Sequence, residues 1–456
     1  METIIVIVFL AGYLAITLEH NLKIDKLIPA LAMMAILWAL IALGIDGYEN
    51  WFDSAHQSLV EGFGKMGHLD KMHMMEESLL HHLGKTAEIL FFLLGAMTIV
   101  EIIDYFDGFA TIKGFIKTKQ KSKLLWLFSI LAFVLSAIID NLTATIVLIT
   151  ILQKVIKDRE TKLWFAGMIV ITANAGGAWS PIGDVTTTML WIANRVSAGQ
   201  LVLHVLLPSL VCMIVPVVIA SRFKVFKGLI DGELDGENSK SKYSGVMLYL
   251  GLGAILFVPI FKTVTHLPPY VGMMLSLAVV ATFAEIYSNK KFSISSVDQE
   301  GQDSEGHHSP VHHSLSKIEL PSILFFLGIL LAVAAMESLG ILFNAAGALN
   351  EAIPNTDIVV MLFGLGSAVI DNVPLVAASM GMFSEPLDNP LWHFIAYSAG
   401  TGGSMLIIGS AAGVVAMGME KIDFFWYLKK IAWLAFVGFV SGAIVFILLR
   451  DFVLHG

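Results

Sequence analysis

The stretch Ala137-Ile138-Ile139-Asp140-Asn141-Leu142-Thr143 is matched further along the chain by Ala368-Val369-Ile370-Asp371-Asn372-Val373-Pro374. Each copy places an acidic residue at the centre of a long apolar segment. An ionised aspartate at the centre of a bilayer costs about 2.5–3.5 kcal/mol on insertion scales. Two such costs in matched contexts predict two copies of one ion-handling element, which meet at a single site near the membrane midplane.

The composition is that of an integral membrane protein. Of the 456 residues, 56% are hydrophobic and 14% are charged, and long apolar runs recur along the whole chain. The single cysteine, Cys212, excludes a disulfide framework and a Cys-based metal site within one chain. The apolar segments predict ten membrane crossings, at 3–18, 27–45, 86–106, 163–194, 201–221, 245–262, 269–287, 320–343, 391–418 and 424–449.

Two further apolar segments, 124–154 and 357–383, carry the Asp-Asn pairs and are predicted to be re-entrant helical hairpins. The first has Lys and Arg on both flanks, so both flanks are expected in the cytoplasm. The second has no Lys or Arg between 344 and 391, which suits the external side. Both termini are then periplasmic, and 46–84 is an external loop with a short amphipathic helix. Of the 28 Lys and Arg residues, this topology leaves six outside, namely Lys65, Lys71, Lys85, Arg195, Lys262 and Arg450.

The chain is predicted to be an internal repeat, because five landmarks recur in the same order. They are Leu27–Met34 with Leu267–Met274, Ile89–Leu93 with Ile323–Leu327, the two Asp-Asn pairs, Leu163-Trp164 with Leu391-Trp392, and Gly176-Gly177 with Gly402-Gly403. Each half holds five crossings, an odd number, so the halves must run in opposite directions, as in many secondary transporters. The predicted fold is an all-α polytopic membrane protein, an inverted repeat of five spans and one re-entrant hairpin per half. Residues 1–221 form the first repeat, 222–243 a cytoplasmic connector, and 244–456 the second repeat.

After each hairpin, a span (163–194 and 391–418) is interrupted by small residues, so broken helices are predicted at the midplane. Unwound backbone at this depth is tolerated only where it is buried in protein or lines a cavity, and it frees groups that bind ions. The candidate ion-binding residues are the oxygen-bearing side chains of the tips and breaks: Asp140, Asn141, Thr143, Asn174, Ser180, Asp184, Thr186, Thr187, Asp371, Asn372, Thr401 and Ser404. Hard cations prefer oxygen ligands, so Na⁺ is expected at Asp140, Asn141, Asp184 and Asp371.

A carboxylate in such a site can exchange one cation for another. Burial and a second nearby carboxylate both favour the protonated form, so a proton competes with Na⁺. Two simpler interpretations stay open, because Asp-Asn pairs also suit helix N-caps and Gly-Gly pairs also suit tight helix packing. Asp184 has no carboxylate counterpart, since Ser410 occupies that position in the second half. We therefore expect the ion to lie nearer Asp140 than Asp371.

In these residues the chain resembles the NhaD family of sodium/proton antiporters, within the ion transporter superfamily. The resemblance covers nearly the whole chain and is most specific at Ile139–Thr145, Asn174–Thr187 and Ile370–Pro374. Related dicarboxylate symporters carry Ser-Asn-Thr at their hairpin tips, and Asp in place of that Ser favours cation exchange. The resemblance implies exchange of Na⁺ or Li⁺ for H⁺ in a bacterial inner membrane, and a scaffold that often dimerises. The functional set it implies is Asp140, Asn141, Asn174, Asp184, Thr186, Thr187, Asp371 and Asn372.

The expected activity is therefore cation/proton antiport, with Na⁺ or Li⁺ and H⁺ as transported ions and with no cofactor. The expected partners are the lipid bilayer and a second copy of the chain, and nucleic acid is not expected. An anion, oxyanion or dicarboxylate transporter of the same fold is the alternative, and a passive channel is a third class. An enzyme is not expected, because no nucleophile–base pair or metal triad appears at membrane depth.

Overall fold

The computed structural model describes residues 1–17, 23–53, 58–114, 116, 118–230, 243–295, 309–318, 320–369 and 372–454. Within these ranges the chain is almost entirely helical, and β1 (Phe52–Asp53) and β2 (Ser58–Leu59) form one short antiparallel pair. The predicted all-α fold is thus confirmed for the described chain. Two residues of the second predicted tip, Ile370 and Asp371, lie outside the described residues.

The helices of the first half follow the predicted apolar segments. They are α1 (Glu2–Thr17), α3 (Leu27–Leu43), α4 (His68–Tyr105), α5 (Ala110–Lys113), α6 (Lys121–Ile139), α7 (Asn141–Val155), α8 (Arg159–Gly177), α9 (Val185–Ile192) and α10 (Ala198–Ala220), with 3₁₀ turns at Ile45–Gly47, Phe63–Lys65 and Lys224–Phe226. Segment 124–154 is interrupted at Asp140, between α6 and α7. Segment 163–194 is interrupted between α8 and α9, where a broken span was predicted.

The second half has the same order of interruptions. Its helices are α11 (Ser244–Thr265), α12 (Pro269–Ser295), α13 (Pro310–Ser316), α14 (Leu320–Ser338), α15 (Ile341–Ala352), α16 (Thr356–Ser367), α17 (Asn372–Met382), α18 (Pro390–Gly402), α19 (Ala411–Glu420), α20 (Phe424–Lys430) and α21 (Ala432–Leu449), and a π-helical turn at Arg450–Leu454 ends the described chain. The predicted hairpin 357–383 corresponds to α16 and α17, and the broken span 391–418 to α18 and α19.

By length and composition, seven helices in the described chain could cross a membrane. They are α4, α6, α10, α11, α12, α14 and α21, the last counted with the π-helical turn that follows it. Other predicted crossings are shorter apolar helices, such as α1 and α3, or spans divided by a break. The protein is therefore a multi-pass membrane protein, while the count of ten crossings, the re-entrant hairpins and the inversion of the halves stay predictions.

The helix expected within 46–84 is present but is longer than predicted. The predicted short amphipathic helix in 46–84 is not separate, because α4 begins at His68 and continues without a break to Tyr105 over 38 residues. Between 68 and 85 the chain is rich in Leu, Met, Glu and Lys, which are good helix formers, and no proline interrupts it. Helix α4 therefore extends almost five turns beyond the apolar segment that was predicted as the third span.

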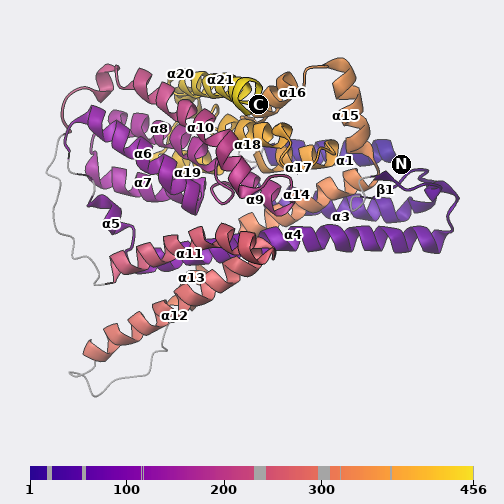
Figure 1. The fold of residues 1–456 in the computed structure, drawn as a ribbon, viewed down its shortest axis with the longest axis horizontal. Helices are drawn as coiled ribbons and strands as arrows, with labels where there is room; N and C mark the ends of the chain where they lie inside the picture. The colour runs from indigo at the N-terminus through magenta and orange to yellow at the C-terminus, as the bar shows by residue number, and fades with distance from the viewer. Residues whose placement is uncertain are drawn as a thin grey trace.

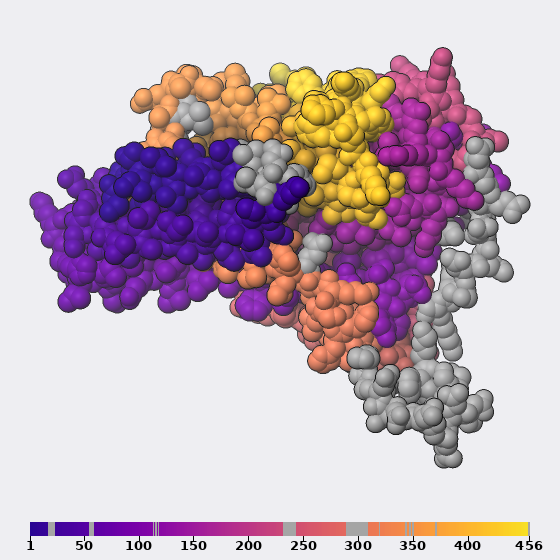
Figure 2. All heavy atoms as spheres, turned by 180° about the vertical axis from the view of Figure 1, so that it is seen from behind, coloured from indigo at the N-terminus to yellow at the C-terminus, as the bar shows by residue number. Residues whose placement is uncertain are grey.

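Two groups of helices can be distinguished by their packing. In the first group α3 packs on α14, α4 on α12 and α14, and α11 on α12. In the second, α6 packs on α8, α10 on α21, and α16 on α18. Figure 1 shows α4, α11 and α12 along one side of the molecule and α20 and α21 along the opposite side. Seen from behind, the indigo N-terminal helices form one end of the molecule (Figure 2).

The two predicted hairpin–break units have matching close contacts between backbones. A Cβ atom on Gly176 would collide with the backbone carbonyl of Phe133, and one on Gly402 would collide with that of Gly364. In each half, then, the first arm of the hairpin packs directly against the backbone of the helix that precedes the break. The Gly-Gly landmarks serve tight packing, which was one of the two interpretations left open for them.

A serine hydroxyl forms a hydrogen bond across each of these two helix contacts. Ser136 Oγ donates a hydrogen bond to the carbonyl of Ala173 over 2.5 Å, and Ser367 Oγ donates to that of Ala399 over 2.9 Å. All four residues are buried. The recurrence of the same bond at matched positions supports the internal repeat.

Gly176→Ala is expected to destabilise the protein. The added methyl group would overlap a backbone carbonyl that cannot move without shifting α6, and overpacking of this kind typically costs about 1–3 kcal/mol. Thermal unfolding in detergent measures the loss. The control is Gly199→Ala in α10, where a Cβ atom meets nothing within 4 Å; its midpoint is expected to stay the same or rise slightly. Equal midpoints for the two variants would contradict the packing argument.

Candidate ion-binding site

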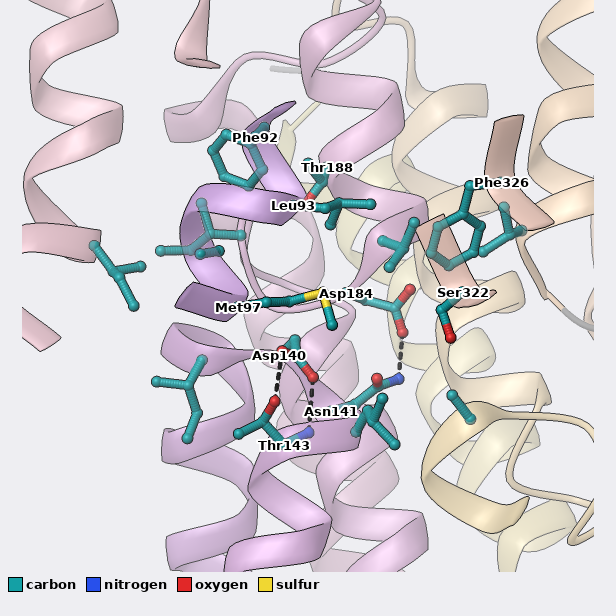
Figure 3. Close-up of a pocket in the computed structure, with 18 of the residues that line it drawn as sticks. Phe92, Leu93, Met97, Asp140, Asn141, Thr143, Asp184, Thr188, Ser322 and Phe326 are labelled. Atoms are coloured by element: carbon teal, nitrogen blue, oxygen red, sulfur yellow. Dashed lines mark hydrogen bonds between the residues drawn. The ribbon is translucent and has the colours of Figure 1, made fainter. Parts of the chain in front are cut away.

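A pocket lies where the predicted tips and the first break come together. Its cavity volume is about 100 Å³, and the residues that line it include Asp140, Asn141, Asp184 and Asn372. Figure 3 shows these parts of the second helix group facing side chains of α4 and α14, among them Met97. The structure thus brings together residues that are 232 positions apart in the sequence (140 to 372), as the repeat predicts.

Asp140 caps the helix that follows it. Its carboxylate accepts a hydrogen bond from the Thr143 N–H at 2.8 Å and another from the Thr143 hydroxyl at 2.9 Å (Figure 3). Its backbone has φ 76° and ψ 159°, a strained conformation that is essentially confined to glycine, so the surrounding structure must hold it in place. The capping interpretation is therefore right for this residue, and it is compatible with ion binding because Asp140 is only partly buried and lines the pocket.

Asp184 is the centre of the hydrogen-bond network. It is 2% exposed, and its Oδ1 accepts bonds from the N–H and the hydroxyl of Thr186 at 2.8 and 2.7 Å. The amide of Asn141 donates to its Oδ2 at 2.5 Å, and the amide of Asn372 lies 3.4 Å from both oxygens. These donors are neutral groups, and hydrogen bonds of this kind offset part of the cost of a buried charge. Both tips therefore reach one carboxylate.

Asn174 joins the two halves. Its Oδ1 accepts a bond from the Asn141 amide at 3.0 Å, and its own amide donates to Ser410 Oγ at 2.9 Å. Ser410 and Asp184 hold equivalent positions, since both are N-caps with extended backbone. The predicted asymmetry is visible here, because the cap contacting the pocket from the first half is a carboxylate and its counterpart is a hydroxyl.

The N-termini of four helices converge on the pocket. The first residues of α7, α9, α17 and α19, which are Asn141, Val185, Asn372 and Ala411, all line it. Helix N-termini carry partial positive charge, which stabilises carboxylates and opposes a lone cation. A cation could therefore enter only if the carboxylates hold it.

The remaining predicted site residues act locally. The hydroxyls of Thr187, Thr401 and Ser404 donate to backbone carbonyls three or four residues earlier in the chain, and Ser180 Oγ accepts an N–H two residues later. All four are buried but lie away from the pocket lining. The predicted Asp371 lies outside the described residues.

Sequence reasoning missed several pocket residues, chiefly Lys26, Met97, Ser322 and Phe326. Lys26 directly precedes α3, and its ammonium lies 4.5 Å from the centre of the Phe325 ring. These residues reach the pocket only because α3 and α4, from the first half, both pack against α14, from the second. No local sequence signal marks them.

The polar side chains that line the pocket offer oxygen atoms as possible ligands. Among the residues that the structure describes, no group of three or more His, Cys, Asp or Glu side chains is arranged to hold a metal ion. What the pocket offers is two carboxylates, Asp140 and Asp184, with amide and hydroxyl oxygens nearby. Oxygen donors of this kind suit hard cations.

The chain is similar to several known membrane transporters. The sequence profile of a family described as "Citrate transporter" matches residues 5–389. Sodium/proton antiporter 1 of Arabidopsis thaliana is 40% identical over 98% of this chain and 72% of its own length. Sodium/proton antiporter 2 of the same plant is 37% identical, over 98% and 99%. The Na⁺/H⁺ antiporter NhaD of Vibrio cholerae is 30% identical, over 97% and 91%.

A solved structure is similar in fold. The YdaH transporter of Alcanivorax borkumensis superposes with a TM-score of 0.60, covering 94% of this chain and 98% of its own, at 11% sequence identity. Fold and relatives together define a polytopic membrane transporter of the ion transporter superfamily, not an enzyme. Within that class, the chain belongs to the NhaD family of sodium/proton antiporters. The family resemblance inferred from the tips and breaks is confirmed.

Proposed function

We propose that this protein exchanges Na⁺ or Li⁺ for H⁺ across the membrane. The observation that carries the proposal is the meeting of both tips at one carboxylate. Asn141 and Asn372 contact Asp184, while Asp140 lines the same pocket. The names of the similar plant and bacterial proteins point to the same activity.

In the proposed cycle, Asp140 and Asp184 bind either a cation or protons. Two carboxylates beside four helix N-termini form a site in which cation binding and protonation each neutralise the same charge. A proton arriving from outside therefore displaces Na⁺, and its departure on the other side restores the site. Movement of the two helix groups past each other would give alternating access, and we propose Asp371 as a further ion ligand at the second tip.

The test uses purified protein in vesicles with an imposed pH gradient and a pH-sensitive dye. Adding Na⁺ or Li⁺ is expected to dissipate the gradient, whereas K⁺ and citrate leave it unchanged. Because the proton and Na⁺ compete, lower pH should raise the Na⁺ concentration for half-maximal exchange without lowering the maximal rate. A gradient that responds to none of these cations would refute the proposal.

A specific observation favours one alternative, transport of a carboxylate anion. Lys26 and four helix N-termini line the pocket, and each would attract an anion. The two acidic side chains oppose it, since they would repel a di- or tricarboxylate at close range. Uptake of labelled citrate or succinate without cation-dependent proton movement would establish the alternative and remove the antiport proposal.

The proposed setting is a bilayer that sustains a proton gradient, such as a bacterial inner membrane, with both termini on the periplasmic side. We further propose that two copies associate within the bilayer, without a nucleic-acid partner or a cofactor. A terminal tag that is cleaved by protease in spheroplasts tests the orientation. Cleavage only after lysis would show that the tagged terminus lies in the cytoplasm.

A further inference from the structure

A second pocket lies further along the helices that form the first. Its cavity volume is about 290 Å³, and its lining includes Lys85 on α4, Glu337 on α14 and Arg195 just after α9. Helix α17 contributes Ala377. Helices α4, α9, α14 and α17 therefore border both pockets, which places the two cavities end to end along one helical frame.

The separation between the pockets is one helical turn. On each of the four helices, the nearest residues of the two linings are three or four positions apart, which corresponds to about 5.4 Å along the axis. The pairs, second pocket first, are Ile89 and Phe92 on α4, Leu330 and Phe326 on α14, Ala377 and Val373 on α17, and Ile192 and Thr188 on α9. Residues at this spacing share a helix face, so a single stripe of each helix lines both cavities.

An aromatic pair lies where the two linings approach each other, because Phe92 is the residue of the first lining nearest the second on α4, and Trp191 directly precedes Ile192 of the second lining. The rings of Phe92 and Trp191 meet edge to face at 6.1 Å, and their exposures are 2% and 1%. Lys262 fixes the tryptophan, because its ammonium donates to the Trp191 carbonyl at 2.9 Å and lies 4.8 Å from the ring centre. About one turn of mainly apolar side chains, together with the Trp191 ring that Lys262 holds, therefore separates the two cavities.

The charges of the two pockets agree with opposite sides of the membrane. Lys26, in the first pocket, belongs to the set predicted to be cytoplasmic, while Lys85 and Arg195, in the second, belong to the six predicted to be external. Matched helices also pass the pockets in opposite directions. Along α4 the second pocket comes first, and along α14 it comes last.

We propose that the second pocket is the outer vestibule of the ion pathway, and that Phe92 and Trp191 form the barrier between the two sides. This inference rests on the proposed antiport, because it assigns the route by which the same ion leaves. A barrier one turn thick lets a small displacement of α9 and α17 against α4 and α14 transfer access from one cavity to the other.

Thiol labelling tests the arrangement. In a Cys212→Ala background, which removes the single native cysteine, Ala334→Cys reports on the second pocket and Ala96→Cys on the first. A membrane-impermeant thiol reagent is added to one side of oriented vesicles at low temperature without Na⁺ or Li⁺, so that exchange does not carry the site across. The two cysteines are expected to react from opposite sides, and modification of either is expected to stop antiport. The control is Phe91→Cys, on a face of α4 that is exposed in the structure and is expected to contact lipid. A membrane-impermeant reagent is expected not to reach it.

Phe92→Ala tests the barrier itself. Loss of the ring is expected to make Ala96→Cys reactive from both sides and to add a proton leak, whereas Phe92→Leu, which keeps most of the apolar volume, should retain sidedness. Reaction of both reporter cysteines from one side, or no reaction at Ala334→Cys, would overturn the inference. So would unchanged sidedness in a folded Phe92→Ala protein. If the protein catalyses antiport but the labelling results differ from those expected, only the vestibule is refuted. If it catalyses no antiport, the proposed function is refuted.

Discussion

Asp140→Asn is expected to abolish cation-dependent proton exchange while the protein folds and inserts normally. Asparagine is as good an N-cap as aspartate and has nearly the same shape, so it places no new demand on the backbone of this position. Its side-chain oxygen can still accept the Thr143 N–H. The charge is lost, and the Thr143 hydroxyl must accept from the new amide instead of donating to a carboxylate oxygen. A unit charge about 4 Å from a cation is worth about 4 kcal/mol at an effective dielectric constant of 20. A loss of more than about 100-fold in apparent Na⁺ affinity follows, since each 1.4 kcal/mol is tenfold.

The matched control for this variant is Asp107→Asn. Asp107 also has a positive φ, of 54°, but it is exposed in the turn after α4 and lies away from the pocket. The same chemical change there should leave both folding and exchange unaltered. The measurement is dye dequenching on Na⁺ addition in vesicles with equal amounts of inserted protein. Wild-type exchange in Asp140→Asn would show that this carboxylate is a cap and nothing more.

The parts of the fold that could be predicted are those with a local signal. An Asp-Asn pair inside an apolar run marked the division of α6 from α7 at Asp140, and a cluster of Gly, Ser and Pro marked the break between α8 and α9. Apolar length gave the first helix as 3–18 against Glu2–Thr17 in the structure. Such signals are visible in the sequence because a charge or an unwound turn is costly in lipid. Either one therefore stands out within an apolar segment.

The parts that could not be predicted depend on contacts between distant segments. Lys26 and Phe326 enter the pocket through the packing of α3 against α14, which no local pattern encodes. Conversely, Thr401 and Ser404 were expected to face the ion because they carry oxygens, yet their hydroxyls bond to their own backbone. Ser and Thr commonly do this within helices, so composition alone overestimates the ligand set. The link between Asn174 and Ser410 likewise required the fold.

Asp184→Asn is expected to remove Na⁺ binding as completely as Asp140→Asn removes exchange, with a measurable loss of stability as well. The remaining side-chain oxygen of the asparagine can still accept the Thr186 N–H and so cap the helix. The new amide, however, would replace the oxygen that accepts the Asn141 amide, so two donors would face each other in a site that is 2% exposed. A buried donor left without an acceptor costs about 1–3 kcal/mol. The expected result is thus a folded protein with a lower unfolding midpoint.

Ligand-induced stabilisation separates binding from folding in this variant. A ligand that binds only the folded state stabilises it by about 2.7 kcal/mol at 100 times its dissociation constant. Na⁺ should therefore raise the unfolding midpoint of the wild type in detergent and leave that of Asp184→Asn unchanged. Asp158→Asn is the control, because Asp158 also caps a helix, accepting the Thr161 N–H at 2.8 Å, but is exposed at the start of α8; it should keep the full Na⁺ response. If Na⁺ still raised the midpoint of Asp184→Asn, the ion would have to be held by the other carboxylates, and the centre of the site would move from Asp184 to the tips.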